Sequence, residues 1–262
     1  MKCVLVTGAG GGMGLSITRR LIDSGYRVFA LDRREFDCPG ATKIICDVTS
    51  EGEVARAVEE ISGDCDELYA VVHTAGIYDL DSLVEMDEER FLRIFNVNLF
   101  GVYRLNRHLL PLMKQGSRVL ITTSELAPLD PLPFTGVYAI TKAALEKYAY
   151  SLRMELNLLG ISVSVIRPGA VSTTLLGDST AALDRFCGNT KIYSCNAERF
   201  KKIVNSVEAR SVSAERIADV VLRALSAKKP RFVYKINRNP LLLLLNALPD
   251  RLQVFIIKQI LK

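Results

Sequence analysis

The chain has 262 residues, of which 49% are hydrophobic and 24% are charged, and its formal net charge is +5. These fractions lie near globular averages, which excludes a disordered, collagen-like or repeat protein. The Lys and Arg residues are scattered rather than gathered into a basic stripe, which argues against a nucleic-acid partner. At about 150 residues per domain, this length allows one large domain or two small ones.

The N-terminus and the cysteines bear on the compartment. Glycines from Gly8 onward interrupt the first apolar run, which is therefore too short for the apolar core of a signal peptide. The six cysteines form no CxxC pair and no metal-ligand spacing, which predicts reduced thiols and no metal site. No apolar run approaches the ~20 residues of a membrane span. We therefore expect a cytoplasmic protein, with peripheral contact to a membrane left open.

Seven short apolar runs predict β-strands. Several are nearly continuous, such as Val4–Val6, which is typical of strands buried on both faces of a parallel sheet. The predicted strands are Lys2–Thr7, Arg27–Asp32, Thr42–Val48, Leu68–Thr74, Arg118–Ser124, Ile161–Arg167 and Arg231–Lys235.

Stretches with helical periodicity lie between these runs. They cover about residues 14–24, 87–108, 135–159 and 213–227, and a capping box at Ser50 and Glu53 opens another helix. Strand–helix alternation along the chain predicts an α/β fold with a doubly wound, mostly parallel sheet of about seven strands and helices on both faces. No linker or repeat interrupts it, so we expect a single domain over residues 1–262.

The first strand leads into a glycine-rich loop and then into a helix. Glycine lets the backbone turn sharply and approach a bound group closely, and the helix N-terminus offers N–H groups that suit a pyrophosphate. The strand–turn–helix context predicts a dinucleotide site. The loop contains Gly8, Gly10, Gly11, Gly12, Met13 and Gly14.

Asp32 ends the second strand, where a carboxylate can accept hydrogen bonds from ribose hydroxyls and disfavour a 2′-phosphate. It predicts NAD rather than NADP as the cofactor, the alternative being a solvated turn acid. Arg33 and Arg34 follow directly, and either could contact a 2′-phosphate.

Tyr138 and Lys142 lie four residues apart near the start of a predicted helix, so their side chains share one face. A free tyrosine has a pKa near ~10 and is a poor base, whereas a neighbouring positive charge favours the phenolate and lowers the pKa. We therefore expect the Tyr138 phenol, beside Lys142, to act as a proton donor and acceptor. Ser124 ends a buried strand, where ligands sit in open α/β sheets, and its hydroxyl could hold a substrate oxygen.

These motifs resemble those of the short-chain dehydrogenase/reductase family in its compact single-domain form, over about Lys2 to Leu176. Gly8, Gly12 and Gly14 match the TGxxxGxG loop, and Tyr138 and Lys142 match YxxxK. Ser124 matches the catalytic serine, and Asn98 matches the asparagine that completes a proton relay through water. Asp47 and Val48 match the pair that contacts adenine, and Pro168, Gly169 and Thr173 match a PGxxxT segment beside the nicotinamide. The resemblance extends the cofactor-binding set to Arg33, Thr74, Ala75, Gly76, Tyr138, Lys142 and Val171.

Two departures from the family pattern stand out. The chain has His73-Thr74-Ala75-Gly76 where the family usually has Asn-Asn-Ala-Gly, and we expect His73 to be a strand-end substitute rather than a catalytic base. The stretch between Ser124 and Tyr138 is slightly long and rich in proline, which we interpret as variation at the substrate mouth.

The resemblance implies an oxidoreductase that transfers a hydride between NAD(H) and a secondary alcohol or ketone. Tyr138 would move the proton, Lys142 would lower the pKa of Tyr138 and hold the ribose, Ser124 would steady the oxygen, and Asn98 would anchor a relay water. The alternatives are a nucleotide-sugar epimerase or dehydratase and a non-catalytic NAD-binding sensor. The glycine spacing and the short chain after Lys142 argue against the first, and the intact Tyr138 and Lys142 argue against the second. The family also implies a homodimer or homotetramer built through the two long helices.

Residues 174–212 are expected to contain a substrate-covering loop. No carboxylate-binding arginine stands out there, which favours an apolar alcohol or ketone such as a hydroxysteroid, although Arg185, Lys191 and Arg199 leave an anionic group open. The apolar candidates, for which core packing is an equal alternative, are Leu175, Leu176, Leu183, Phe186, Tyr193 and Phe200.

Residues 240–262 form an apolar C-terminal extension that Pro249 divides into two segments, each too short to span a bilayer. In the second segment, one helical face is predicted to contain Leu252, Phe255, Ile256, Gln259 and Ile260, with Arg251, Lys258 and Lys262 available for the other. Four interpretations stay open: a helix on a membrane surface, a cover over an apolar substrate pocket, a subunit contact, or ordinary core packing. Similar tails accompany family members acting on steroids and retinoids, which favours a lipophilic substrate.

Overall fold

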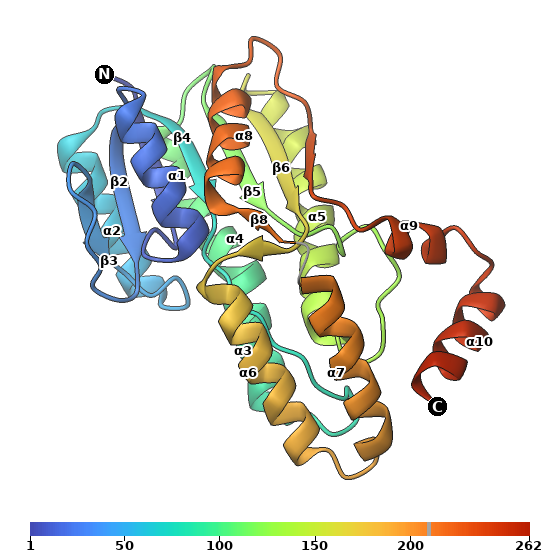
Figure 1. The fold of residues 1–262 in the computed structure, drawn as a ribbon. Coiled ribbons are helices and arrows are strands. Elements are labelled where there is room, and N and C mark those ends of the chain that lie inside the picture. Colours follow the sequence, from blue (N-terminus) through green and yellow to red (C-terminus); the bar gives the residue numbers. More distant parts are fainter. Residues whose placement is uncertain (209–210) are drawn as a thin grey trace.

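A computed structural model describes residues 1–208 and 211–262, except for the side chains of residues 174–179 and 206–208. One parallel sheet forms its centre, with helices on both faces (Figure 1). The sheet has seven strands in the order β3-β2-β1-β4-β5-β6-β9, so the predicted fold class is confirmed. The strands are β1 (Cys3–Thr7), β2 (Arg27–Asp32), β3 (Thr42–Ile45), β4 (Leu68–His73), β5 (Arg118–Thr122), β6 (Ser162–Pro168) and β9 (Val233–Ile236).

All seven predicted strands exist, but three of the predictions extend too far at the carboxyl end. β3 ends at Ile45 rather than Val48, β4 at His73 rather than Thr74, and β5 at Thr122 rather than Ser124. The surplus residues leave the sheet and enter loops at its carboxyl edge. A β-branched residue stands past each of these strand ends, namely Val48, Thr74 and Thr123, so composition alone does not mark the boundary.

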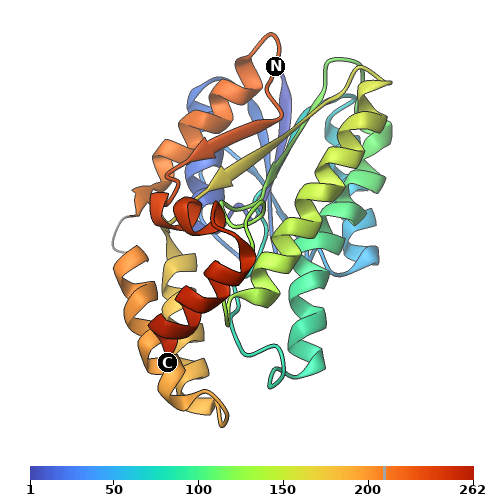
Figure 2. The same cartoon turned by 90° about the vertical axis from the view of Figure 1, so that its right-hand side faces the viewer.

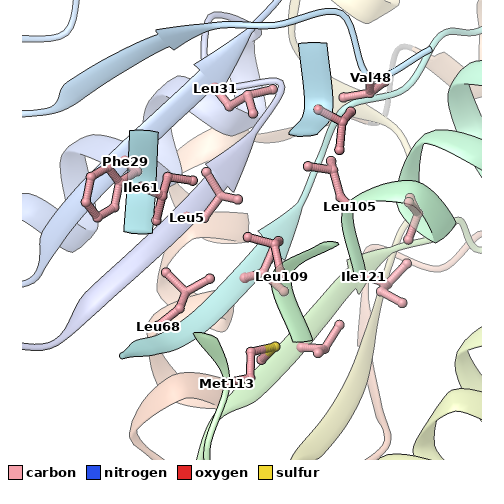
Figure 3. Packing of buried hydrophobic residues seen from close by; sticks show 14 of the residues in the cluster. Leu5, Phe29, Leu31, Val48, Ile61, Leu68, Leu105, Leu109, Met113 and Ile121 are labelled. Carbon is pink, nitrogen blue, oxygen red and sulfur yellow. The ribbon is translucent and has the colours of Figure 1, made fainter. Parts of the chain in front are cut away.

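Alternate side chains of the central strands fill two separate cores. Leu5, Phe29 and Ile121 point to the side covered by α2 (Glu51–Asp64), α4 (Gly101–Leu109) and α5 (Gly136–Asn157) (Figure 3). Val4 and Val6 point to the side covered by α1 (Gly12–Asp23) and α8 (Ala214–Ser226). Burial on both faces explains the nearly continuous apolar runs of these strands.

The predicted helix over residues 87–108 is interrupted. α3 (Glu88–Phe95) passes into a π-helical turn, η1 (Asn96–Phe100), before α4 begins. A π-helical turn inserts one extra residue per turn and is frequent at functional sites. The turn contains Asn98, which is fully buried. α2 begins as predicted, since the Ser50 side chain accepts a hydrogen bond from the Glu53 amide at 3.3 Å.

A helical lobe stands beyond the carboxyl edge of the sheet (Figure 1). It consists of α6 (Thr174–Asn189) and α7 (Ser194–Glu208), and a short two-stranded sheet of β7 (Val171–Ser172) and β8 (Val212–Ser213) connects it to the main sheet. A short 3-10 helix, η2 (Leu110–Leu112), follows α4. The chain ends with α9 (Pro240–Asn246) and α10 (Asp250–Leu261), of which α10 packs against α7 (Figure 2).

In the described part of the chain, no helix has both the length and the hydropathy to cross a membrane. Over the same residues, no cluster of three or more His, Cys, Asp or Glu side chains suits a metal ion.

Candidate active site

A cleft of about 920 Å³ opens at the carboxyl edge of the sheet, beyond β1, β2 and β4. The strand order reverses between β1 and β4, and ligands of open α/β sheets bind at such a switch point. Most of the predicted cofactor-binding residues line the cleft: Gly8, Gly10, Gly11, Gly12, Met13, Gly14, Asp32, Arg33, Asp47, Val48, Thr74, Ala75, Gly76 and Thr173. Tyr138, Lys142, Pro168, Gly169 and Val171 do not belong to its lining.

The glycine loop is packed so closely that side chains would not fit. A Cβ on Gly14 would lie 2.1 Å from the Gly8 carbonyl oxygen, and one on Gly12 would lie 2.7 Å from the Cβ of Thr173. Gly8 has a φ of +66°, which glycine adopts without strain. The loop therefore presents bare backbone to the cleft.

The N-terminus of α1 follows the loop with no side-chain cap and no acidic residue in its first turn. Its free N–H groups and positive dipole end suit a diphosphate. The opposite wall is tied to the loop, since the Thr74 hydroxyl donates to the Thr7 carbonyl at 2.5 Å. A dinucleotide therefore fits the donor groups that this cleft presents.

Asp32 lies at the edge of the cleft and is held by two backbone amides. Its carboxylate accepts from the Gly10 amide at 3.0 Å and from the Arg34 amide at 3.1 Å. The side chains of Arg33 and Arg34 are exposed and also line the cleft. The carboxylate thus has a fixed position, while both guanidinium groups lie on flexible stems.

Several lining residues were not predicted from the sequence. Phe36 contacts the glycine loop, since a Cβ on Gly10 would lie 3.1 Å from its side chain. A stripe on α3, η1 and α4 lines the cleft at spacings of three to four residues, a periodicity that could have identified it. The stripe comprises Arg93, Asn96, Val97, Phe100 and Arg104.

The four predicted catalytic residues are brought together although they lie on three separate elements. Tyr138 and Lys142 share the first turns of α5, and Ser124 follows β5. All four side chains are buried, with Asn98 fully so. The Ser124 side chain lies near enough to the Tyr138 phenol to lower the pKa of that phenol. The Lys142 Nζ donates to the Thr122 carbonyl at 3.1 Å and lies 5.6 Å from the Tyr138 ring centroid.

Asn98 clamps the segment that follows the glycine turn after β4. Its Oδ1 accepts from the Ile77 amide at 2.8 Å, and its Nδ2 donates to the Ile77 carbonyl at 3.0 Å and to the Thr141 hydroxyl at 3.2 Å. The same turn is close to the lysine, since a Cβ on Gly76 would lie 3.5 Å from the Lys142 Nζ. Asn98 thus connects the wall of the cleft to α5.

Burial dominates the ionisation of the tyrosine–lysine pair. It raises the pKa of Tyr138 above its ordinary value, the charge of neighbouring Tyr78 raises this pKa further, and the nearby Ser124 side chain opposes both. Burial lowers the pKa of Lys142 to about 8. Lys142 is not among the groups that shift the pKa of Tyr138 in this structure, so its predicted effect on that pKa stays a prediction.

His73 ends β4 and is fully buried away from the cleft lining. Its Nε2 lies 2.9 Å from Asn106 Oδ1, and Asn106 in turn donates to the Tyr148 hydroxyl at 3.1 Å. Burial lowers the pKa of His73 to about 4, so the ring is neutral at pH 7. This position supports the interpretation of His73 as a strand-end residue.

Glu125, next to Ser124, was not singled out from the sequence. Its carboxylate accepts from the Asn239 amide at 2.7 Å, and burial raises its pKa. A Cβ on Gly169 would lie 2.9 Å from Glu125 Oε1 and 1.9 Å from the Asn237 carbonyl oxygen, so only glycine fits there. The loop after β5, the turn after β6 and the segment before α9 therefore meet beside Ser124.

The predicted substrate-side residues pack mainly against one another. Leu183, Phe186 and Phe200 are buried in the core of the helical lobe, and Phe134 contacts Tyr193 there with ring centroids 5.2 Å apart. Their role as core contacts outweighs a role in a loop over substrate, since amphipathic α6 and α7 bury these side chains between them. The side chains of Leu175 and Leu176 lie outside the described residues.

The three cationic residues of this lobe that left an anionic substrate group open, Arg185, Lys191 and Arg199, differ in their partners. Arg185 forms an ion pair with Asp79, which also pairs with Arg90 at 2.9 Å. Lys191 and Arg199 are exposed.

The comparisons with known proteins identify the family and support the fold. The family model for short chain dehydrogenase matches residues 2–184, and the chain belongs to this family. It is a dehydrogenase/reductase acting on CH–OH or carbonyl groups.

Two relatives match most of the chain. The uncharacterized oxidoreductase YbbO of Escherichia coli (strain K12) is 31% identical over 90% of this chain and 86% of its own length. The 3-ketodihydrosphingosine reductase of Bacteroides thetaiotaomicron is 25% identical over 98% of this chain and 97% of its own length. The solved structure of Thermoplasma acidophilum aldohexose dehydrogenase has the same fold, with a TM-score of 0.74, 22% identity, and coverage of 89% of this chain and 92% of that one.

Proposed function

We propose that the protein transfers a hydride between NAD(H) and a lipophilic secondary alcohol or ketone. The observation that carries the proposal is that Ser124, Tyr138 and Lys142 are buried together beside a cleft lined by bare glycine backbone, with the Lys142 Nζ 5.6 Å from the Tyr138 ring centroid. When bound, the oxidised nicotinamide supplies the hydride acceptor and a positive charge.

Tyr138 is the proposed proton donor in ketone reduction and the proposed acceptor in alcohol oxidation. Its phenol is shielded from water, so the proton passes directly between the phenol and the substrate oxygen rather than to solvent. Ser124 is buried near the phenol, so its hydroxyl is proposed to hold the same substrate oxygen. Lys142, with a pKa lowered to about 8, can change its protonation near neutral pH and replace the proton that Tyr138 gives up.

The preference for NAD rests on Asp32. Two backbone amides hold its carboxylate at the edge of the cleft, where it can accept ribose hydroxyls and repel a 2′-phosphate. The exposed side chains of Arg33 and Arg34 favour NADP instead, because either one could contact a 2′-phosphate. The remaining cofactor contacts are proposed at Pro168, Gly169 and Val171, at the end of β6 and the start of β7.

The lipophilic substrate is supported by the surroundings of the tyrosine. Tyr138 packs in a cluster with Ile94 and Val137, against which Tyr78 and Leu126 also pack. The relative that matches nearly the whole chain is named as a reductase of 3-ketodihydrosphingosine. A hydroxysteroid is the other lipophilic class that we propose to test.

We also propose a cytoplasmic homodimer or homotetramer built through α4 and α5. Exposed apolar side chains on these two helices support a subunit contact, namely Tyr103, Tyr150 and Met154. Sedimentation of the purified chain would measure this state.

The test is a change in nicotinamide absorbance with NAD(H) and NADP(H) in parallel, using a long-chain 3-ketone, a 17-ketosteroid, a short ketone and a nucleotide sugar. We expect turnover with NADH and at least one lipophilic ketone, and little with the short ketone. A clear preference for NADPH would overturn the role of Asp32. Conversion of the nucleotide sugar without net coenzyme turnover would instead favour an epimerase, and coenzyme binding without any turnover would favour a sensor.

A further inference from the structure

The charge of the chain is concentrated in its last 36 residues. Residues 227–262 contain eight Lys or Arg residues and a single acidic residue, Asp250. The rest of the chain has 26 Lys or Arg residues and 28 acidic ones, so residues 1–226 are slightly negative. Within the described residues, none of these eight basic side chains forms an ion pair. Three of these eight residues, Arg251, Lys258 and Lys262, lie on α10 or directly after it, whereas Lys228, Lys229 and Arg231 precede β9 at the opposite, amino edge of the sheet.

The same segment exposes apolar side chains. Six of the nineteen exposed large hydrophobic side chains among the described residues lie on α9 and α10. Grouped exposed apolar side chains mark an interaction surface, whereas single ones need no explanation. The six are Leu241, Leu244, Leu252, Val254, Phe255 and Ile260.

The orientation of α10 is fixed by contacts on its opposite side. Gln253 is buried and donates to the Leu248 carbonyl at 2.9 Å, and Leu261 is buried in the core of the helical lobe. The Asn196 side chain donates to the Leu261 carbonyl at 2.6 Å. The helix thus turns an amide toward the protein and Phe255, 57% exposed, away from it.

Basic and apolar side chains share this outward face. Arg251, Phe255, Lys258 and Lys262 follow one another at spacings of four, three and four residues, which places them on one side of the helix. Long basic side chains can extend past an apolar neighbour and keep their charge in the headgroup layer. This arrangement is typical of a helix that lies in the interface of an anionic membrane.

We propose that α9 and α10 form a docking surface for an anionic lipid bilayer. Charge complementarity selects this occupant, because basic side chains near such a surface add to the binding of the apolar ones. A second copy of the chain is the weaker occupant. A two-fold contact through this surface would place each basic segment against its own copy, and like charges oppose association.

Docking at this surface would also orient the candidate active site. Asn239, just before α9, donates its amide to Glu125, and the Asn246 side chain donates to Asp130 at 2.8 Å. Both acceptors lie on the loop between Ser124 and Tyr138. A bilayer bound by α9 and α10 therefore lies beside the mouth through which a lipophilic substrate would enter.

Vesicle sedimentation of the full chain tests the proposal directly. We expect binding to vesicles of phosphatidylcholine with phosphatidylglycerol, weaker binding to phosphatidylcholine alone, and a loss with added salt. Each basic residue contributes about fivefold to partitioning, so the triple variant Arg251→Gln, Lys258→Gln, Lys262→Gln should lose roughly 100-fold. Leu158→Ser is the matched control, because Leu158 is 85% exposed and lies outside the segment.

Fluorescence gives a second measurement that does not depend on enzyme activity. The chain contains no Trp, so Phe255→Trp introduces a single reporter, and Leu158→Trp provides its control. We expect a blue shift on anionic vesicles for Phe255→Trp alone. Equal spectra for the two variants, or no binding of the unmodified chain, would overturn the proposal. A change of molar mass in the triple variant with unchanged vesicle binding would assign the surface to a second copy.

Discussion

The catalytic end of the sheet and the C-terminal segment after β9 use polar and apolar side chains in opposite ways. At the catalytic end, Asn98, Ser124 and Lys142 are buried and hydrogen-bonded. In the C-terminal segment, Phe255 and Leu241 face outward while Gln253 is buried. Each region departs from the rule that apolar residues lie inside and polar residues outside. The departures coincide with the two proposed binding surfaces, as expected where function opposes folding.

The two departures have different consequences for the free energy of unfolding. A buried polar group is stable only with its hydrogen-bond partners. Removing one partner leaves the desolvation of the group uncompensated and lowers the free energy of unfolding. An outward apolar side chain has few partners to lose. Substitutions should therefore act strongly on turnover at the catalytic end and weakly on stability in the C-terminal segment.

The largest expected effect is that of Tyr138→Phe. Removing the hydroxyl deletes the proposed proton donor, so kcat should fall by about 10²- to 10⁴-fold. Coenzyme affinity, measured by titration calorimetry, should stay close to that of the unmodified protein. Tyr148→Phe is the matched control, since Tyr148 lies on the same helix and bonds Asn106. Full activity of Tyr138→Phe would remove Tyr138 from the mechanism.

Asp32→Ala should have the next largest effect. Losing hydrogen bonds to a charged group costs about 1.5–3 kcal/mol, which corresponds to a roughly 10- to 150-fold rise in KM for NAD and a weaker discrimination against NADP. Steady-state kinetics with both coenzymes measures this change. Asp37→Ala serves as the control, because Asp37 is exposed in the same loop. An unchanged coenzyme ratio would contradict the prediction.

His73 should make stability depend on pH. Its folded pKa of about 4 lies below its ordinary value of 6.5, so the unfolded chain binds a proton first as the pH falls. The contribution to stability is complete above pH 6.5 and is lost between pH 6.5 and about 4, by up to about 3 kcal/mol. Urea unfolding at several pH values should show a shallower dependence for His73→Asn than for His108→Asn, the variant of the other histidine. Parallel curves for the two variants would show that His73 does not contribute.

The smallest effect is expected for Phe255→Ser on the outward face of α10. Thermal unfolding in the absence of lipid should change the free energy of unfolding by less than about 0.5 kcal/mol, because the side chain has little to lose. Leu261→Ala on the inward face should cost about 2 kcal/mol, because Leu261 is buried. A larger cost for Phe255→Ser would mean that its ring packs against the protein, and the contrast between the regions would fail.

The strands and the glycine loop were predictable because their signals are local. A buried parallel strand needs an apolar run, and the loop needs glycine wherever a Cβ would collide, as at Gly14. Three features depended on distant contacts and were not predictable. The π-helical turn brings Asn98 to Ile77, Glu125 finds its partner at Asn239, and α10 buries Gln253 beside Asp130.

The outward face of α10 shows most clearly what helical periodicity in the sequence cannot predict. Periodicity grouped Leu252, Phe255 and Ile260 on one apolar face and left the basic residues for the other. In the structure those three side chains are exposed, and the basic side chains lie on the same side of the helix as Phe255. Periodicity finds that a helix has two faces, but the surrounding contacts decide which of them turns inward.

The hydrogen bond between Glu125 and Asn239 spans 114 residues of sequence. β9 forms one edge of the sheet and precedes Asn239 in the chain. The ribosome therefore synthesises the loop after β5 well before it synthesises β9 and Asn239. Contacts of such large separation close late and slow folding. During synthesis, the coenzyme cleft can therefore assemble while the loop beside Ser124 still lacks its partner, and the substrate side matures only when the end of the chain arrives.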